Sequence, residues 1–331
     1  MYEKQTSYLN KTGRPTVTDW LTLPDLDARA TEYDEAVATG FTVDRFCSSS
    51  FWILPAARHL APEALPWIAS GNGAYAVLAR SASWLHPLEA TWGLCCPLVG
   101  RDPDAAVDLF LGALEGESEW NAALATGLAL SSSLWKKLGR ALARRYGVER
   151  GPTTRRYVAH LEDGLDGFLE RRPGGLRKSL EKARRRGERS GLTFEVRDRG
   201  EASFERILAV ERRSWKGQNG VGIDREPMRS FYRDMNRRLL DRGRRRLMFA
   251  RLEGEDVAYI FGAVFGDTYR GLQFSFDSRF SSLSLGNLCQ LEEVRRLIES
   301  GLRRYDLGSE VRYKQKWGEE VVETACLIAR R

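Results

Sequence analysis

The chain has 331 residues, 42% hydrophobic and 29% charged, a balance typical of one large or two medium domains folded in water. No apolar run reaches about 18 residues and the N-terminus lacks a basic-then-apolar signal, so membrane spanning and secretion find no support and we expect a cytoplasmic protein. The formal net charge of +7 favours an anionic partner.

Helices and strands alternate along the first half of the chain. Residues 1–25 are polar and interrupted by prolines, which is typical of a loosely packed arm. Periodicity and turn signals then predict a helix at 30–40, an apolar segment at 51–60, paired strands at 75–80 and 84–96, a helix at 102–114, a strand at 121–130 and a basic amphipathic helix at 134–146.

A boundary is expected at Gly151–Thr154, where a glycine and a proline precede two threonines. Beyond it the pattern predicts a strand at 157–161, a helix beginning at 165–170, a very basic helix at 177–189, a helix at 204–215, a flexible polar loop at 216–222 and a helix at 227–240. The basic helix is either a solvated face or a surface for phosphates or tRNA. It lacks the aromatic residues that stack on bases.

The stretch from Leu247 to Gly308 organises the rest of the sequence. An apolar run at 247–250, a strand at 257–265 that is apolar on both faces, and a two-faced strand at 269–277 follow one another across turn signals. A loop of small residues then leads into an amphipathic helix that ends at Gly301, and a short strand closes the stretch at 305–308.

The start of that helix is a candidate anion site. Unpaired amide groups and the positive end of the helix dipole meet there, Gly286 permits close approach, and no acidic residue appears before Glu292. An ordinary helix capped by Ser284 is the alternative. The candidate phosphate-binding residues are Arg279, Ser284, Leu285, Gly286 and Asn287.

Several segments together resemble the GNAT acyltransferase fold in its FemX/CelD-like, FemAB-like branch, whose members usually contain two modules in tandem. The matching segments are 176–187, 213–215, 276–278, 284–286, 306–308 and 313–318. The resemblance implies an α/β chain of two tandem GNAT-like modules, each a mixed, largely antiparallel sheet flanked by helices. It covers residues 155–331 well, with modules expected at 1–150 and 151–331.

The first module repeats the element order of the second, but the start of its helix differs. Asp102 and Asp104 place two carboxylates where a phosphate would lie, and like charges repel. We therefore expect the first module to be a scaffold or a wall of the substrate site, without its own cofactor.

The resemblance implies direct acyl transfer, which needs a base for the acceptor and a donor for the carbonyl oxygen. Asp277 is the candidate base, with a turn cap as its structural alternative. Lys314 lies where FemX-like relatives have a lysine in their substrate cleft, and it would hold an anionic group of the acceptor or polarise the carbonyl. Trp215, Gln273 and Tyr313 are candidate substrate-binding residues.

The expected function is an N-acyltransferase that uses acyl-CoA, with an acetyl or longer chain, and an amine of a small molecule or peptide. Two alternatives stay open: aminoacyl-tRNA as donor, as in FemX-like peptidyl ligases, and a catalytically inactive binding module. No coiled-coil arm for gripping tRNA is evident, which favours CoA. Five cysteines and three histidines lie at no metal or nucleophile spacing, so no metal site is expected and thiols should be reduced and mostly buried.

Overall fold

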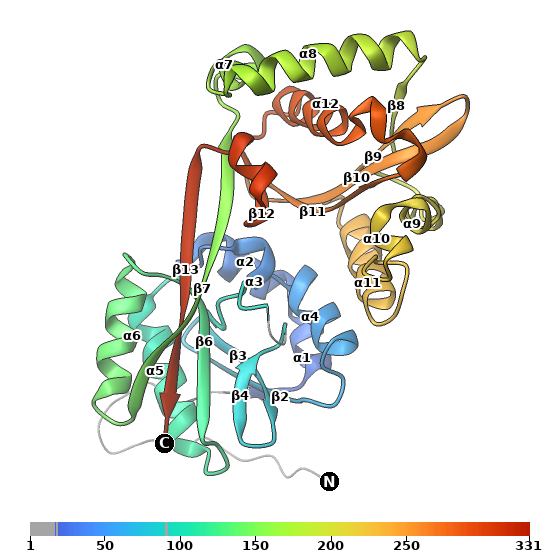
Figure 1. The fold of residues 1–331 in the computed structure, drawn as a ribbon. Helices are drawn as coiled ribbons and strands as arrows, with labels where there is room; N and C mark the ends of the chain where they lie inside the picture. The colour runs from blue at the N-terminus through green and yellow to red at the C-terminus, as the bar shows by residue number, and fades with distance from the viewer. Residues whose placement is uncertain (1–16, 18, 90–91) are drawn as a thin grey trace. The chain divides into compact units, whose positions relative to one another are not determined.

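The computed structural model describes residue 17 and residues 19–89 and 92–331, which form two compact units (Figure 1). The first unit runs to Thr154 and also includes Glu323–Arg331, and the second unit is Arg155–Val322. The C-terminal residues thus return to the first unit, whereas the sequence placed them in the second module. Most of the predicted N-terminal arm lies outside the described residues.

The first unit is a mixed sheet packed against helices. Its strands lie in the order β1-β2-β3-β4-β6-β13, and each neighbouring pair is antiparallel except β4 with β6. Buried side chains of α5, α6 and the sheet form its core. The elements are β1 (Asp19–Leu21), α1 (Leu23–Ala28), α2 (Ala30–Thr39), α3 (Arg45–Ser48), α4 (Ser50–His59), β2 (Leu65–Gly71), β3 (Ala74–Ser81), β4 (Trp84–Pro87), β5 (Leu98–Val99), α5 (Pro103–Gly116), β6 (Ala122–Ala129), α6 (Ser133–Ala143) and β13 (Glu320–Arg330).

One strand prediction in this half is corrected. The strand expected at 84–96 ends at Pro87, because the buried carboxylate of Glu89 takes the amides of Leu94 and Cys95 away from any neighbouring strand. The boundary glycine, Gly151, lies inside β7 (Gly147–His160). A Cβ there would meet Cys326 at 3.1 Å, so the close approach of β13 explains why a glycine occupies this position.

The second unit has the strand order β7-β12-β11-β10-β9-β8. Each neighbouring pair is antiparallel except β11 with β12, which is parallel. Its elements are the end of β7, α7 (Gly164–Glu170), α8 (Gly174–Arg189), β8 (Thr193–Val196), α9 (Ser203–Arg213), α10 (Trp215–Gln218), α11 (Met228–Asp241), β9 (Arg245–Leu252), β10 (Glu255–Phe265), β11 (Thr268–Phe276), the 3-10 helix η1 (Ser278–Leu283), α12 (Leu285–Glu299), β12 (Arg304–Ser309) and the 3-10 helix η2 (Arg312–Lys316).

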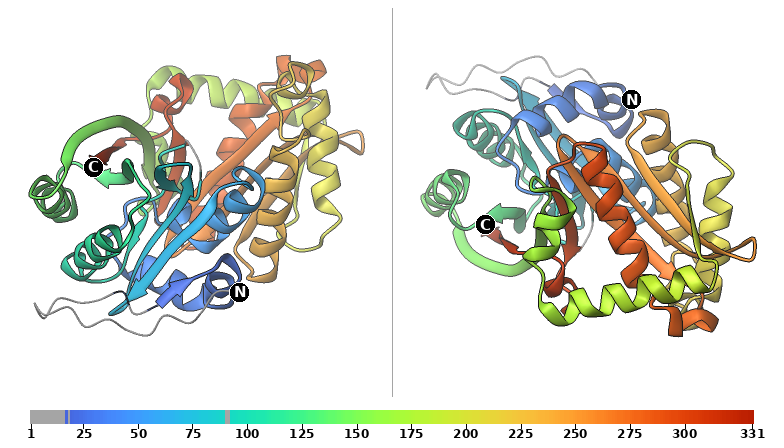
Figure 2. Two further views of the ribbon diagram at one scale, coloured as in Figure 1. Left: turned by 90° about the horizontal axis from the view of Figure 1, so that it is seen from below. Right: turned by 90° about the horizontal axis from the view of Figure 1, so that it is seen from above.

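Helices cover both faces of the second sheet. The basic helix α8 lies beside α12 on one face, and α9, α10 and α11 lie on the other (Figures 1 and 2). Every residue of Val257–Phe265 is buried, as expected of a strand covered on both sides. The polar loop expected at 216–222 is helical in its first part, because the Ser214 side chain accepts the amide of Gly217 and caps α10.

The two units repeat one arrangement. In each, a run of antiparallel strands ends in a short parallel pair joined by one helix: β4, α5 and β6 in the first unit, and β11, α12 and β12 in the second. The predicted fold class, two modules with mixed and largely antiparallel sheets, is confirmed. None of the described helices is long and apolar enough to cross a membrane.

Candidate active site

The first feature of the site is the uncapped start of α12. Ser284 has a left-handed backbone (φ 58°) and its side chain makes no cap bond, so the first amides of the helix stay available for a ligand. A Cβ on Gly286 would lie 3.3 Å from the Phe274 ring, which shows how closely the helix start approaches β11. With no acid in the first turn, this geometry suits an anion.

A cation from α8 stands beside the same loop. The guanidinium of Arg186 donates to the carbonyl of Ser282, three residues before the first residue of α12. Gly187 makes this approach possible, because a Cβ there would lie 3.1 Å from Leu288 of α12. Sequence analysis placed Arg186 in the basic helix but could not assign it to the loop.

The second feature is the open edge of β11. Among the described residues, β11 pairs with β12 only from Thr268, opposite Arg304, to Arg270, opposite Asp306. β11 itself continues to Phe276. The carbonyl of Phe274 accepts a hydrogen bond from Lys216 Nζ at 2.8 Å instead of from a strand. The two strands therefore leave backbone groups free for an extended ligand between them.

Lys314 stands at this gap. Its Nζ donates to the Ser309 carbonyl at 2.8 Å. Gly308 has φ +79°, and a Cβ added to it would lie 3.5 Å from Lys314 Nζ and 3.7 Å from Arg270 Cζ. Burial and the Arg270 charge lower the pKa of Lys314 to about 8, against the opposing effect of Asp306. The ammonium form still predominates at neutral pH.

Asp306 holds the cations behind Lys314. Its carboxylate forms ion pairs with Arg270 at 2.8 Å and with Arg156 at 3.4 Å, and accepts a hydrogen bond from the amide of Gly308 at 2.8 Å. Burial alone would raise the pKa of Asp306, but the two guanidinium groups outweigh it and keep the pKa low. This carboxylate is ionised and fully committed.

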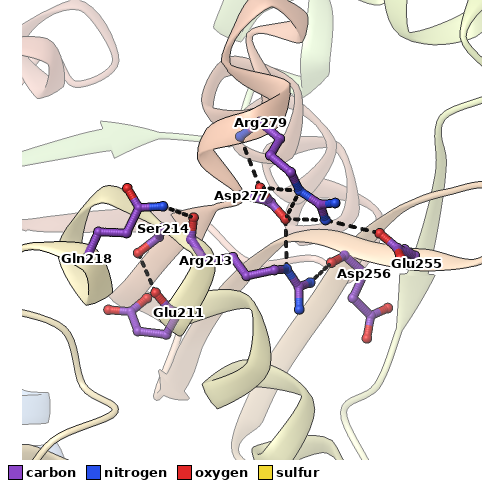
Figure 3. A network of polar contacts seen from close by, with 8 residues as sticks. All are labelled: Glu211, Arg213, Ser214, Gln218, Glu255, Asp256, Asp277 and Arg279. Carbon is purple, nitrogen blue, oxygen red and sulfur yellow. Dashed lines mark hydrogen bonds and ion pairs between the residues drawn. The ribbon is translucent and has the colours of Figure 1, made fainter.

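The predicted base, Asp277, has contacts that suit a structural role (Figure 3). Its side chain caps η1 through the Arg279 amide at 3.0 Å, and its oxygens bond Arg279 at 2.8 Å and Arg213 at 2.7 Å. Burial would raise its pKa, but the Arg279 and Arg213 hydrogen bonds outweigh it and lower the pKa. A carboxylate held this way is a poor proton acceptor.

We therefore expect Asp277→Asn to cost stability more than turnover. Removing the charge leaves two guanidinium groups without their anion, a loss of about 1–3 kcal/mol in the free energy of unfolding, because both arginines reach water. Since the pKa is lowered on folding, this contribution is full above about pH 4 and is lost as the pH falls further. Urea unfolding of both forms measures it. Unchanged stability with a 100-fold loss of turnover, on the order expected for a lost base, would instead restore Asp277 as the base.

The remaining predicted residues divide into two groups. Trp215 and Tyr313 are exposed beside the gap-lining lysines, and Gln273 faces Lys216, with Nζ–Oε1 3.0 Å. Arg279, expected to anchor phosphate, already pairs with Asp277 and with Glu255 at 3.2 Å, so its charge is matched. Lys216 was missed, although it directly follows the matched segment 213–215.

The equivalent helix start in the first unit is closed. Asp102 caps α5 by accepting the amide of Asp104 at 2.9 Å, and Asp104 pairs with Lys137 at 2.6 Å. Among the described residues no group of three or more histidine, cysteine, aspartate or glutamate side chains could hold a metal ion.

Comparisons with known proteins concern the domain and the fold. Residues 174–315 match the family model described as an acetyltransferase (GNAT) domain, and none of the curated proteins compared matches the sequence. The solved structure of FemX has a TM-score of 0.66 at 12% identity, covering 89% of this chain and 95% of that chain.

Two further structures share the fold. The C-terminal domain of a putative lysylphosphatidylglycerol synthetase from Agrobacterium fabrum has a TM-score of 0.60 at 12% identity, covering 92% of each chain. The tandem GNAT protein from the clavulanic acid biosynthesis pathway has a TM-score of 0.50 at 13% identity, covering 94% of this chain and 97% of that chain.

Residues 174–315 of the second unit thus match the GNAT domain model, and the chain as a whole has a fold similar to that of the tandem GNAT structure. The resemblance to the FemX-like branch is confirmed as a similarity of fold. At these identities the activity has to be argued from the site itself.

Proposed function

We propose that the second unit transfers an acyl group from acyl-CoA to an amine by direct attack. The open edge of β11 carries the proposal, because it runs from an uncapped helix start suited to phosphates to an ammonium suited to a carbonyl oxygen. A donor with a pyrophosphate at one end and a thioester at the other matches both ends of this edge.

The chemistry divides among a few groups. The amides of Leu285 and Gly286 and the guanidinium of Arg186 hold the phosphates. Lys314 polarises the thioester carbonyl, the neutral amine attacks its carbon, and the tetrahedral intermediate expels the CoA thiolate. The amine gives its proton to water, because Asp277 and Asp306 are both bound by arginines.

A covalent route through a cysteine has no support in the second unit. Cys289 is buried, and burial raises its pKa well above the ordinary range of a thiol. All five cysteines are free and buried.

The direct test is a coupled assay on the full chain. Acetyl-CoA and longer acyl-CoA esters are mixed with a set of amines, free CoA thiol is followed with a thiol reagent, and products are identified by mass spectrometry. Amine-dependent thiol release supports the proposal. Donor binding without release by any amine would favour an inactive binding module.

Aminoacyl-tRNA stays as a second candidate donor because of one feature of α8. Arg184 pairs with Glu188 and Arg185 with Glu181, so these two cations are neutralised within the helix. The five other cations of α8 carry no ion pair among the described residues. Four of them recur on one face, next to the loop that Arg186 contacts: Lys178, Lys182, Arg186 and Arg189. We name this face the α8 basic stripe.

Replacing Lys178, Lys182 and Arg189 by alanine separates the two donors. With acyl-CoA we expect little change in activity and a shallow salt dependence, since one loop meets the phosphates. Each phosphate contact with tRNA contributes about 0.7–0.9 to the log–log salt slope, so a tRNA donor would show a steep slope that the variant flattens. Arg184→Ala with Arg185→Ala is the matched control. Transfer from aminoacyl-tRNA that collapses only in the stripe variant would reverse the choice of donor.

A further inference from the structure

We propose that the acceptor amine carries an anionic group, a carboxylate or a phosphate, which the ammonium of Lys216 binds beside the open edge of β11. The inference rests on the proposed acyl transfer and adds to it the chemical class of the acceptor. It assigns Lys216 as a residue that determines acceptor specificity.

Lys216 is a partly buried cation held by neutral oxygens. Its Nζ donates to Gln273 Oε1 at 3.0 Å and to the Phe274 carbonyl at 2.8 Å. An ammonium has three donors, so one remains for a ligand. Neither acceptor carries a charge, and burial accordingly lowers the pKa of Lys216. A bound anion would compensate the buried charge.

The carboxylates that act on the two lysines are committed elsewhere. Glu211 accepts the Tyr259 hydroxyl at 2.8 Å and the Ile223 amide at 3.2 Å, and Asp306 is bound by Arg156 and Arg270. Four cations thus stand on this face of the sheet: Lys216, Lys314, Arg156 and Arg270. This excess of positive charge favours an anionic ligand over a neutral one.

The lysine is also positioned by the fold. A Cβ on Gly217 would lie 2.3 Å from the carbonyl oxygen of Glu211, so only glycine allows the tight turn that directs α10 toward β11. Gln273 is fixed in turn, because its Nε2 donates to the Tyr232 hydroxyl at 2.8 Å and leaves Oε1 facing Lys216. The ammonium is therefore held at the gap rather than mobile in solvent.

Aromatic side chains flank both lysines. Trp215 precedes Lys216 and is 56% exposed, and Tyr313 precedes Lys314 and is 50% exposed. Exposed aromatic rings next to a fixed cation suit a ligand with an apolar skeleton and one charged group.

Two matched pairs of acceptors test the inference. Ethanolamine and O-phosphoethanolamine differ by a phosphate, and β-alaninamide and β-alanine differ by a carboxylate. With acetyl-CoA as donor we expect at least one anionic member to have a kcat/KM about 10-fold to 100-fold above its neutral partner. The pair that shows the preference identifies the anion. Equal rates within both pairs would overturn the inference while leaving the acyl transfer in place.

Lys216→Gln should lower the rate with the anionic member far more than the rate with its neutral partner and so remove the preference, because the amide can still hydrogen-bond but carries no charge. Lys178→Gln, on the α8 basic stripe, is the control and should keep the preference. A merely structural lysine would instead lower the rates of both members alike, and that result would contradict the assigned role.

A second measurement needs no catalysis and no variant. Acetic anhydride labels lysines in the full wild-type chain, and peptide mass spectrometry reads Lys216. O-phosphoethanolamine or β-alanine should slow labelling of Lys216, while their neutral partners at equal ionic strength should not. Unchanged labelling with every compound would overturn the anion site. Protection in a chain that transfers no acyl group would uphold the anion site and refute only the acyl transfer.

Discussion

Gly286→Glu is expected to weaken acyl-CoA binding about 100-fold or more, because it places bulk and negative charge where the helix start would meet phosphate. The new Cβ lies 3.3 Å from the Phe274 ring, so the side chain has to turn toward the loop. Calorimetry with a non-hydrolysable acyl-CoA analogue measures the effect.

Gly175→Glu is the matched control for this change. Gly175 lies in the first turn of α8, with nothing within 4 Å of an added Cβ, so it carries the same charge at another helix start. Gly286→Ala separates the steric effect from the charge. Equal donor affinity of Gly286→Glu and the wild type, with both folded, would remove the loop from the site.

The centre of the second unit was predictable because its signals are local. Nine consecutive buried positions in Val257–Phe265 describe a strand covered on both faces. The loop of small residues that leads to Gly286 predicted the start of α12. Ser284 does stand at the N-cap position, but its left-handed backbone directs the side chain away from the amides. The capped-helix alternative therefore fails on backbone geometry, which spacing does not reveal.

The contacts of Asp277 could not be predicted, because they come from far along the chain. Arg213 is 64 positions away, and it reaches Asp277 only once α9 packs beside β11. The sequence shows that Asp277 ends the polar face of a strand. A general base and a residue that caps the following turn would both occupy such a position. Charge partners at long range decide between the two roles.

Lys216 and the last strand were hidden for related reasons. Lys216 follows a tryptophan and precedes glycine, glutamine and asparagine, a composition that predicts a loop, yet the Ser214 cap makes the segment a short helix. β13 pairs with β6, as in Thr324 with Ala129. Because these strands are far apart along the chain, the hydrophobic pattern of β13 does not show which unit the strand joins.

Lys314 should show the largest effect on catalysis. If its ammonium stabilises the charge that develops on the thioester oxygen, Lys314→Met should lower kcat by about 100-fold to 1,000-fold with little change in donor affinity. Lys316→Met, an exposed lysine in the same 3-10 helix, is the control and should be active. Single-turnover kinetics with saturating acyl-CoA measure the chemical step.

The pH profile distinguishes this role from that of a base. Burial and the neighbouring cations bring the pKa of Lys314 to about 8, so the charged form is present below that pH and disappears above it. With an alkoxyamine acceptor, which stays neutral throughout, the wild-type rate should therefore fall as the pH rises through about 8. Lys314→Arg keeps its charge, so it should be slower but lose this alkaline decline, because guanidinium does not deprotonate in the range. A wild-type rate that rises through the same pH would instead make neutral Lys314 the proton acceptor. The carbonyl would then need another donor, and Lys216, the second ammonium at the open edge of β11, would be the next residue to test.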